Sequence, residues 1–271
     1  MTKKKDLEEK YQQLQELLLS FGKVIVAFSG GVDSTFLTVV AHRLLGKNAI
    51  AITIASPLIP SEELAQAKNL AKKIGISHKI ITKDIDDHFK WFETNPPNRC
   101  YLCKKSSLQL IINYCKENKY EGVIIEGSNF SDLDDYRLGM KAVQELQGRS
   151  PLLEVGLTKK EIRALAKENG IPVWDKPSSP CLATRFPFGE KITQEKLAAV
   201  FQGEEYLKSL GFKQVRLRMH GQLARIEVDK KQIRELAIKA PAVSEKLKVL
   251  GFKFITIDLE GYKRGSMNIS D

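Results

Sequence analysis

The stretch Lys-Val-Ile-Val-Ala-Phe-Ser-Gly-Gly-Val-Asp-Ser-Thr occupies residues 23–35 of this 271-residue chain. Its first half, residues 23–28, is a short apolar run, which predicts a parallel strand buried on both faces. The Ser-Gly-Gly turn at 29–31 ends the strand, and residues 34–45 carry a helical pattern that stops before Gly46. A strand, a glycine turn and a helix N-terminus together form an anion site, because several N–H groups point at one place and the helix dipole adds positive potential.

The polar side chains of this turn suit the phosphates of a nucleotide. Ser29 and Ser34 add hydroxyl donors, and Asp33 would repel a bare phosphate but can hold a Mg²⁺ ion that bridges phosphate oxygens. The chain contains neither the P-loop NTPase motif nor the Gly-x-Gly-x-x-Gly motif of dinucleotide folds. We therefore predict a nucleotide-phosphate site whose candidate residues are Ser29, Gly30, Gly31, Val32, Asp33, Ser34, Thr35, Ser56 and Gly127.

Strands and helices alternate through the first two thirds of the chain. Further buried strands are predicted at 49–54, 78–81 and 122–126, and helices at 5–20, 62–74, 108–118 and 158–169. This alternation predicts an α/β fold with a parallel sheet, in which ligands bind at the carboxyl ends of the strands. Residues 29–35, 55–58 and 127–135 each follow a predicted strand, so we expect them to meet at one edge of the sheet.

A loop rich in proline and serine, residues 171–180, marks a domain boundary. The pattern beyond it predicts helices at 194–210, 230–239 and 242–250 and strands at 214–219, 224–228 and 254–259. We expect a larger α/β domain at residues 1–177 and a smaller C-terminal α+β domain at 178–271.

The composition is that of an ordinary globular protein, with 42% hydrophobic and 28% charged residues. No apolar run approaches the length of a membrane span, and residues 1–10 lack the apolar core of a signal peptide, so we expect no membrane partner and a cytoplasmic location. The net charge of +10 invites a nucleic-acid partner. The lysines, however, are scattered beside glutamates, which favours solubility and attraction of small anions such as ATP over tracking of a phosphate backbone.

Three of the four cysteines stand in unusual local sequence. Cys100 and Cys103 form a Cys-x-x-Cys just before a predicted helix, and Cys181 follows a Pro-Ser-Ser-Pro turn, whereas Cys115 lies inside the helical pattern and is expected to be a small buried hydrophobe. A zinc site would normally take four ligands, and a redox pair would leave Cys181 idle. Three thiolates on a [4Fe–4S] cluster would use all three cysteines and leave one iron open for a ligand such as sulfide. Isolated structural cysteines remain the other interpretation.

Several blocks of sequence resemble known families. The octad at residues 28–35 resembles the PP-loop of the ATP pyrophosphatases, which include GMP synthetases, NAD synthetases and tRNA-thiolating enzymes. In that superfamily, with its adenine nucleotide alpha hydrolase-like fold, ATP is cleaved between its α and β phosphates and AMP is placed on an oxygen of the substrate. Longer blocks, at residues 127–142, 179–189, 215–220 with 224–227, and 261–268, resemble the LarE sulfur transferases.

The LarE resemblance implies a specific reaction. These proteins adenylylate a carboxylate of pyridinium-3,5-biscarboxylic acid mononucleotide and replace AMP with sulfur, which gives a thiocarboxylate for the nickel-pincer nucleotide cofactor. Some members give up the sulfur of one cysteine, but the pattern of Cys100, Cys103 and Cys181 resembles the cluster-dependent members. The resemblance therefore implies ATP, Mg²⁺ and a [4Fe–4S] cluster as cofactors, a separate sulfide donor, and a homo-oligomer.

Three arginines are candidates for binding the phosphate of the mononucleotide. Arg216 and Arg218 lie two apart on a predicted strand and so share one face, and Arg185 lies in another of the resembling blocks. Spacing alone fits a solvated strand face equally well, and the resemblance favours the phosphate. A tRNA-thiolating enzyme and a non-catalytic AMP-binding protein are the alternative functions: the first predicts a dedicated RNA-binding element, and the second predicts no release of pyrophosphate.

Overall fold

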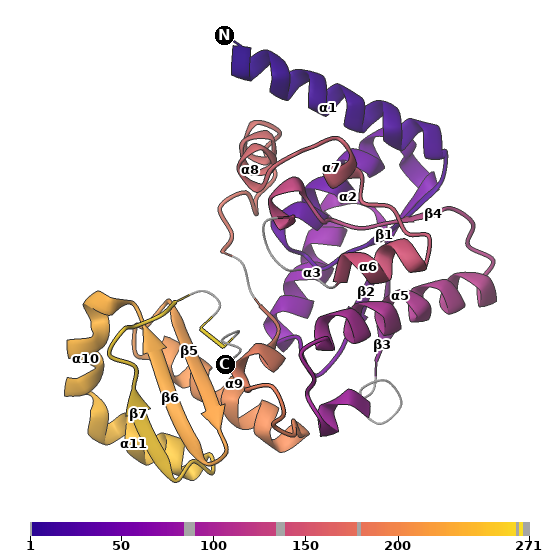
Figure 1. Cartoon of the computed structure of the whole chain (residues 1–271). Coiled ribbons are helices and arrows are strands. Elements are labelled where there is room, and N and C mark those ends of the chain that lie inside the picture. Colours follow the sequence, from indigo (N-terminus) through magenta and orange to yellow (C-terminus); the bar gives the residue numbers. More distant parts are fainter. Residues whose placement is uncertain (1, 84–89, 134–138, 178–179, 264–265, 268–271) are drawn as a thin grey trace. The chain divides into compact units, whose positions relative to one another are not determined.

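The computed structural model describes residues 2–83, 90–133, 139–177, 180–263 and 266–267 (Figure 1). The chain divides into two compact units, of which the first comprises Met1–Phe89 and Asn98–Ser179 and the second Lys90–Pro97 and Pro180–Asp271. Lys90–Pro97 thus belongs to the C-terminal unit although it lies in the middle of the N-terminal sequence.

The N-terminal unit is built on a parallel four-stranded sheet with the order β3-β2-β1-β4. Its strands are β1 (Val24–Ala27), β2 (Ala49–Ala55), β3 (Ser77–Thr82) and β4 (Val123–Ile125). The chain runs outward from β1 to β3 and then returns to the other side of β1 for β4, so the strand order reverses at β1. Such a reversal is where open α/β sheets bind ligands, beyond the carboxyl ends of the strands.

Helices cover both faces of this sheet (Figure 1). They are α1 (Thr2–Phe21), α2 (Val32–Leu45), α3 (Ser61–Ile74), α5 (Arg99–Glu117), α6 (Gly139–Glu145), α7 (Pro151–Glu154) and α8 (Lys159–Glu168), with 3-10 turns η1 (Gly46–Asn48) and η3 (Phe130–Asp132). Because successive residues of a strand point to opposite faces, Val24 and Val26 pack with α1, α2, α3 and α8, while Ile25 packs with Ile111 and Cys115 of α5. The predicted α/β class and the burial of Cys115 are confirmed, and burial raises the pKa of the Cys115 thiol.

Helix α5 begins nine residues before the helix predicted at 108–118, so the Cys-x-x-Cys lies within its first turn instead of before it. The apolar pattern of the sequence did not predict the early turns of α5, because polar contacts stabilise them. Lys104 pairs with Glu126, and Lys105 pairs with Glu145. Two prolines, at 96 and 97, precede the helix and keep it from extending further back.

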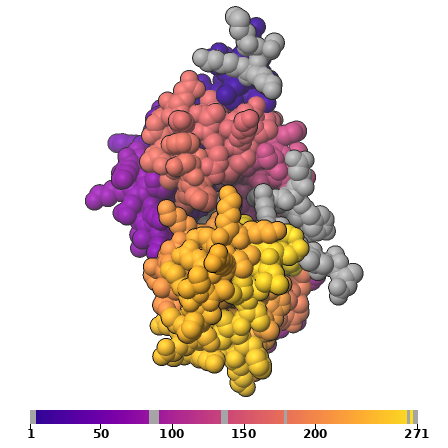
Figure 2. Space-filling view, turned by 90° about the vertical axis from the view of Figure 1, so that its left-hand side faces the viewer, coloured from indigo at the N-terminus to yellow at the C-terminus, as the bar shows by residue number. Residues whose placement is uncertain are grey.

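The C-terminal unit contains a three-stranded sheet with the order β5-β6-β7. Its elements are η2 (Lys90–Glu93), η4 (Leu182–Arg185), α9 (Gln194–Ser209), β5 (Val215–His220), β6 (Leu223–Val228), η5 (Lys230–Gln232), α10 (Ile233–Ile238), α11 (Ala240–Val249) and β7 (Phe254–Ile257). Strands β5 and β6 are antiparallel, and β7 is parallel to β6. Residues from Pro180 onward are coloured orange to yellow in Figure 2. Leu217, Ile226 and Leu247 are among the buried apolar side chains in the described residues of this part of the chain.

One face of this second sheet packs on helices and the other carries charge. A Cβ atom on Gly203 of α9 would lie 2.3 Å from a terminal methyl group of Leu217 and 3.0 Å from one of Leu247, so a larger residue where α9, β5 and α11 meet would force these side chains to shift. The opposite face of the two paired strands carries Arg216, Arg218, Arg225 and Glu227 in register. None of the described helices combines the length and apolar character that crossing a membrane requires.

Candidate active site

The loop after β1 is closed by its own hydroxyl groups. The Oγ atoms of Ser29 and Ser34 lie 3.0 Å apart, the backbone N–H of Gly31 donates to Ser29 Oγ at 3.4 Å, and Ser34 Oγ donates to the Gly31 carbonyl at 3.3 Å. Gly30 adopts a φ of +71°, and a Cβ there would lie 3.1 Å from Ala67 of α3, so both conformation and space favour glycine. Helix α2 then begins at Val32, so the N–H groups of its first turn lie at this turn of the chain.

The loop after β4 reaches the same place. A Cβ on Gly127 would lie 2.9 Å from the backbone nitrogen of Ser34 and 3.2 Å from the carbonyl carbon of Asp33, so Gly127 is in close contact with the first turn of α2. Ser56 directly follows β2, where its carbonyl accepts a hydrogen bond from Ile59 at 3.0 Å. The ends of β1 and β4 are therefore brought together at the point where the strand order reverses.

Asp33 forms an ion pair with Lys159, a residue that sequence reasoning did not select. Lys159 is the first residue of α8, directly after Thr158, whose side chain and that of Glu161 form the predicted capping box. A cation is disfavoured at a helix N-terminus, and here the first turns of α2 and α8 lie close enough for their side chains to pair. The N-termini of α2 and α8 and the ammonium group of Lys159 all add positive potential near this ion pair, which favours the binding of an anion with several charges.

A second lysine contacts the loop from the other side. Lys176 Nζ donates to the Gly30 carbonyl at 3.3 Å and is held by Glu63 Oε2 at 2.6 Å and Gln66 Oε1 at 2.9 Å. Its position after α8 gave no signal in the sequence, because only the folded chain brings it to Gly30.

Glu126, the last residue before Gly127, is buried in a polar network. Its carboxylate accepts hydrogen bonds from Lys104 Nζ at 2.8 Å and from Ser128 Oγ at 2.9 Å, and also from Ser150 Oγ. Burial by itself would raise the pKa of the Glu126 carboxyl, but the charge of Lys104 and these hydrogen bonds outweigh it and lower the pKa. The network fixes the chain that leads into Gly127.

Cys100 and Cys103 lie three residues apart in the first turn of α5, so their side chains share one helix face. Cys100 is exposed and Cys103 half-buried. Lys83, which directly follows β3, reaches this turn: its Nζ lies 3.0 Å from the Cys103 carbonyl, 3.8 Å from Cys103 Sγ and 3.1 Å from Ser107 Oγ. Burial lowers the pKa of Lys83, while negative charge on Cys103 opposes that shift. Two thiols on one helical turn fit two of the three predicted iron ligands.

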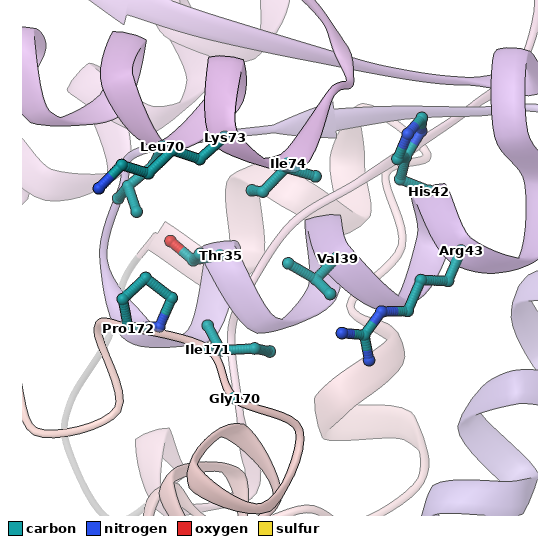
Figure 3. Close-up of a pocket in the computed structure, with 10 residues that line it drawn as sticks. All are labelled: Thr35, Val39, His42, Arg43, Leu70, Lys73, Ile74, Gly170, Ile171 and Pro172. Carbon is teal, nitrogen blue, oxygen red and sulfur yellow. The ribbon is translucent and has the colours of Figure 1, made fainter.

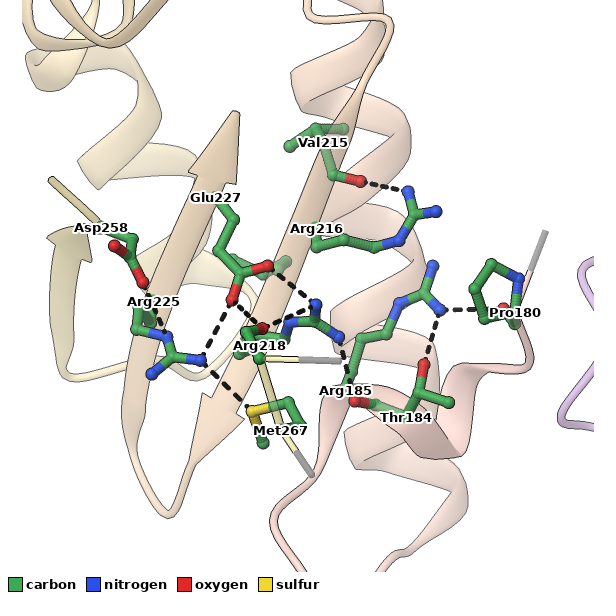
Figure 4. A network of polar contacts seen from close by, with 12 residues as sticks. Pro180, Thr184, Arg185, Val215, Arg216, Arg218, Arg225, Glu227, Asp258 and Met267 are labelled. Atoms are coloured by element: carbon green, nitrogen blue, oxygen red, sulfur yellow. Dashed lines mark hydrogen bonds and ion pairs between the residues drawn. The ribbon is translucent and has the colours of Figure 1, made fainter. Parts of the chain in front are cut away.

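Cys181 belongs to the C-terminal unit, where Arg185 binds the backbone on either side of it. Arg185 Nη1 donates to the Cys181 carbonyl at 3.1 Å. It also donates to the Pro180 carbonyl at 2.8 Å (Figure 4). The other side of the guanidinium is bound by Glu204, with both nitrogen–oxygen distances at 2.9 Å. Both groups are almost fully buried. Arg185 therefore acts in this unit as the anchor of the segment that carries Cys181.

Arg216 differs from the other two arginines in its partners. Arg218 pairs with Glu227 at 2.8 Å, but Arg216 has no carboxylate partner among the residues that the structure describes. Its guanidinium lies 5.2 Å from the centroid of the Tyr262 ring. It donates to the Val215 carbonyl at 2.7 Å (Figure 4). Burial, and then the nearby charge of Arg185, lower the pKa of Arg216. A cation in these surroundings would be stabilised by an incoming anion.

A cavity of about 340 Å³ lies between α2, α3 and the segment Gly170–Pro172 (Figure 3). Arg43 and Lys73 contribute its cationic side chains, and Thr35 is the one predicted ATP residue among those that line it. The remainder of the phosphate loop is not part of this cavity's lining. In the described part of the chain, no three His, Cys, Asp or Glu side chains gather as a metal-binding group.

The structure thus groups the predicted residues in three places. Ser29–Thr35 and Gly127 meet at the carboxyl edge of the parallel sheet, and Cys100 and Cys103 share a turn of α5. The three arginines and Cys181 belong to the C-terminal unit. Their individual roles stay predictions.

Comparisons with known proteins match this chain over most of its length. The family model described as NAD synthase matches residues 6–187. An uncharacterized protein of Synechocystis sp. is 41% identical, with 97% of this chain and 98% of the relative covered. The pyridinium-3,5-bisthiocarboxylic acid mononucleotide synthase of Lactiplantibacillus plantarum is 37% identical, with 97% and 95% covered. The tRNA-specific 2-thiouridylase of Rickettsia peacockii is 29% identical, but only 58% of this chain and 52% of that protein are covered.

Proposed function

The chain belongs to the LarE family of PP-loop proteins, and on this premise we propose that it is an ATP-dependent sulfur transferase of cofactor biosynthesis. Its substrate would be pyridinium-3,5-biscarboxylic acid mononucleotide, whose carboxylate is converted to a thiocarboxylate. The observation that carries this proposal is the glycine loop at the reversal of the strand order, in a chain matched end to end by a synthase of the bisthiocarboxylic acid product.

In the first half-reaction, a carboxylate oxygen of the substrate attacks the α phosphorus of ATP. The bond from that phosphorus to the bridging oxygen breaks, and pyrophosphate leaves with the electron pair. The N–H groups at the start of α2 and the hydroxyls of Ser29 and Ser34 would donate hydrogen bonds to the departing pyrophosphate. A Mg²⁺ ion held by Asp33 would neutralise part of its charge.

Lys159 is the further residue that we assign to this step. Its ammonium group pairs with Asp33. A Mg²⁺ ion held by Asp33 would take over that pairing and would leave the ammonium to bind a phosphate oxygen beside it. The lysine would then stabilise the charge that grows on the leaving group.

In the second half-reaction, a sulfur nucleophile attacks the activated carboxyl carbon and AMP leaves. Cys100, Cys103 and Cys181 would hold a [4Fe–4S] cluster, and such a cluster supplies a sulfide on its fourth iron when it is bound. The support in the structure is the fit of the first two thiols to one helical turn, with Lys83 and Lys104 beside them. Arg185 would keep the third cysteine in place through its backbone.

Arg216 would bind the phosphate of the mononucleotide. Of the three candidate arginines, it is the one whose guanidinium forms no ion pair with a carboxylate of the described residues, and a phosphate would supply that counter-charge. Arg185 and Arg218, each held by a buried glutamate, would add positive potential and fix the geometry.

The test is an anaerobic assay with ATP, Mg²⁺ and the biscarboxylic mononucleotide. We expect pyrophosphate release that depends on the mononucleotide, a product heavier by the exchange of oxygen for sulfur, and iron and sulfide bound to the chain. The assignment of a cluster would be refuted if the protein contained no iron after reconstitution, or if the Cys100→Ala variant still completed multiple turnovers. Pyrophosphate release without the mononucleotide, together with thiolation of tRNA, would favour the tRNA-thiolating alternative. The partial match to a 2-thiouridylase is the observation behind that alternative.

A further inference from the structure

Lys83 is a fully buried lysine directly after β3. Its side chain spans from the carboxyl edge of the sheet to the N-terminal half of α5. There the ammonium contacts a carbonyl oxygen, a hydroxyl and a sulfur: Cys103 O at 3.0 Å, Ser107 Oγ at 3.1 Å and Cys103 Sγ at 3.8 Å. The reaction outlined above uses Cys103 but gives Lys83 no role.

We propose that Lys83 is a positioning residue that stabilises negative charge on the Cys103 sulfur through an N–H···S hydrogen bond and so tunes the sulfur site built on that cysteine. The inference rests on the proposed function, since it concerns a cysteine assigned to iron. It adds a residue and a physical role that the sequence motifs did not indicate.

The contacts to oxygen explain why the ammonium stays at the sulfur. Ser107 Oγ donates to the Cys103 carbonyl at 2.8 Å, so the carbonyl and the hydroxyl, one helical turn apart on α5, both contact the Lys83 ammonium and each other. The rotamers of Lys83 are thereby fixed before any cluster is bound. A buried charge acts through a low local dielectric, so its effect on the sulfur exceeds that of a lysine at the surface.

The expected effect on a cluster has a definite sign. An iron–sulfur core ligated by thiolates gains a negative charge when it is reduced, and a cation or hydrogen bond at a ligand sulfur stabilises that form. Lys83 should therefore raise the reduction potential of a cluster bound at Cys103. It should also raise the reactivity of the free sulfur when no iron is present, because the thiolate is the nucleophilic form.

The plain alternative is that Lys83 only attaches α5 to the sheet through the Cys103 carbonyl and Ser107. That role predicts loss of thermal stability in a variant but no change in the electronic properties of the sulfur. Lys83→Met removes the charge, Lys83→Gln keeps a donor without charge, and Lys83→Arg keeps the charge. Lys105→Met is the matched control, since Lys105 lies on the same helix two residues after Cys103 but pairs with Glu145.

The experiment reconstitutes wild type and these variants anaerobically with ferrous iron and sulfide. It then measures iron per chain, the midpoint potential and the proton couplings of the reduced protein in electron–nuclear double resonance. We expect a more negative potential and less iron in Lys83→Met and Lys83→Gln, partial recovery in Lys83→Arg, and wild-type values in Lys105→Met. Wild type should show a solvent-exchangeable proton coupled to the cluster, which serves as the readout if the variants do not fold.

Two results would overturn the inference. One is a folded Lys83→Met protein with the wild-type potential, and the other is a wild-type cluster without an exchangeable coupled proton. If wild type takes up no iron, the cluster part of the proposed function fails, and the inference about Lys83 is judged on the iron-free chain. There, peptide mapping should show Cys103 modified by iodoacetamide several-fold faster in wild type than in Lys83→Met, and equal rates would refute it.

Discussion

Replacing Lys159 with methionine tests the role of the cation that pairs with Asp33 in the phosphate loop. An ammonium about 4 Å from a phosphate charge contributes roughly 4 kcal/mol at an effective dielectric constant near 20. The Lys159 side chain is 35% exposed, so solvent screening reduces this contribution to about 2–3 kcal/mol. At about 1.4 kcal/mol for each tenfold change, Lys159→Met should lower the rate of pyrophosphate release roughly 30- to 150-fold.

The assay is mononucleotide-dependent release of pyrophosphate at saturating Mg²⁺-ATP. Lys160→Met is the matched control, because Lys160 is the next residue of the same helix and is exposed. Both variants should keep wild-type thermal stability to within about 1 kcal/mol, since a partly exposed ion pair contributes little to folding. An unchanged rate in Lys159→Met would refute the assignment, and so would an equal fall in Lys160→Met.

Three further predictions concern other parts of the fold. Gly127→Ala places a methyl group 2.9 Å from the Ser34 nitrogen and should lower kcat/KM for ATP about 100-fold by displacing the loop. A wild-type kcat/KM in this variant would contradict the close contact between Gly127 and Ser34. Glu204→Ala leaves the Arg185 guanidinium buried without its carboxylate and should cost about 3–5 kcal/mol in urea unfolding, with Glu204→Gln costing less. Burial and the charge of Lys68 lower the pKa of His78 from 6.5, so the folded state binds fewer protons than the unfolded state. The free energy of unfolding should therefore fall as the pH drops below about 6.5. His78→Gln should reduce this dependence on pH, and an unaltered pH profile would show that other groups cause it.

The sheet and its ligand edge were predictable because their signals are local. Val24–Ala27 is apolar on both faces, and the glycines after it permit a turn that other residues would strain. The capping box of Thr158 and Glu161 fixed the start of α8 equally well. Each of these features is encoded within a few consecutive residues, so the sequence alone carries the information.

The lysines of the site could not be predicted, because their contacts are not local in the sequence. Lys83, Lys159 and Lys176 meet their partners across 20, 126 and 146 residues of sequence respectively. Among the chain's 43 lysines and arginines, nothing local separates them from those that face solvent. The start of α5 was missed on similar grounds, because long-range polar contacts, not an apolar stripe, hold its first turns.

The assignment of Lys90–Pro97 to the C-terminal unit has a consequence for synthesis on the ribosome. Trp91 and Phe92 are buried, and the Phe92 carbonyl and Asn95 bind to Ile192 and Pro187 respectively. Those partners emerge about 100 residues later, which takes about 5–20 s at ordinary elongation rates. During that interval the aromatic side chains of Trp91 and Phe92 belong to a nascent chain that still lacks Pro187 and Ile192, although its strands β1 to β3 can already pair. We infer that this is the stage at which a chaperone, or a delay in translation, would have the greatest effect on yield.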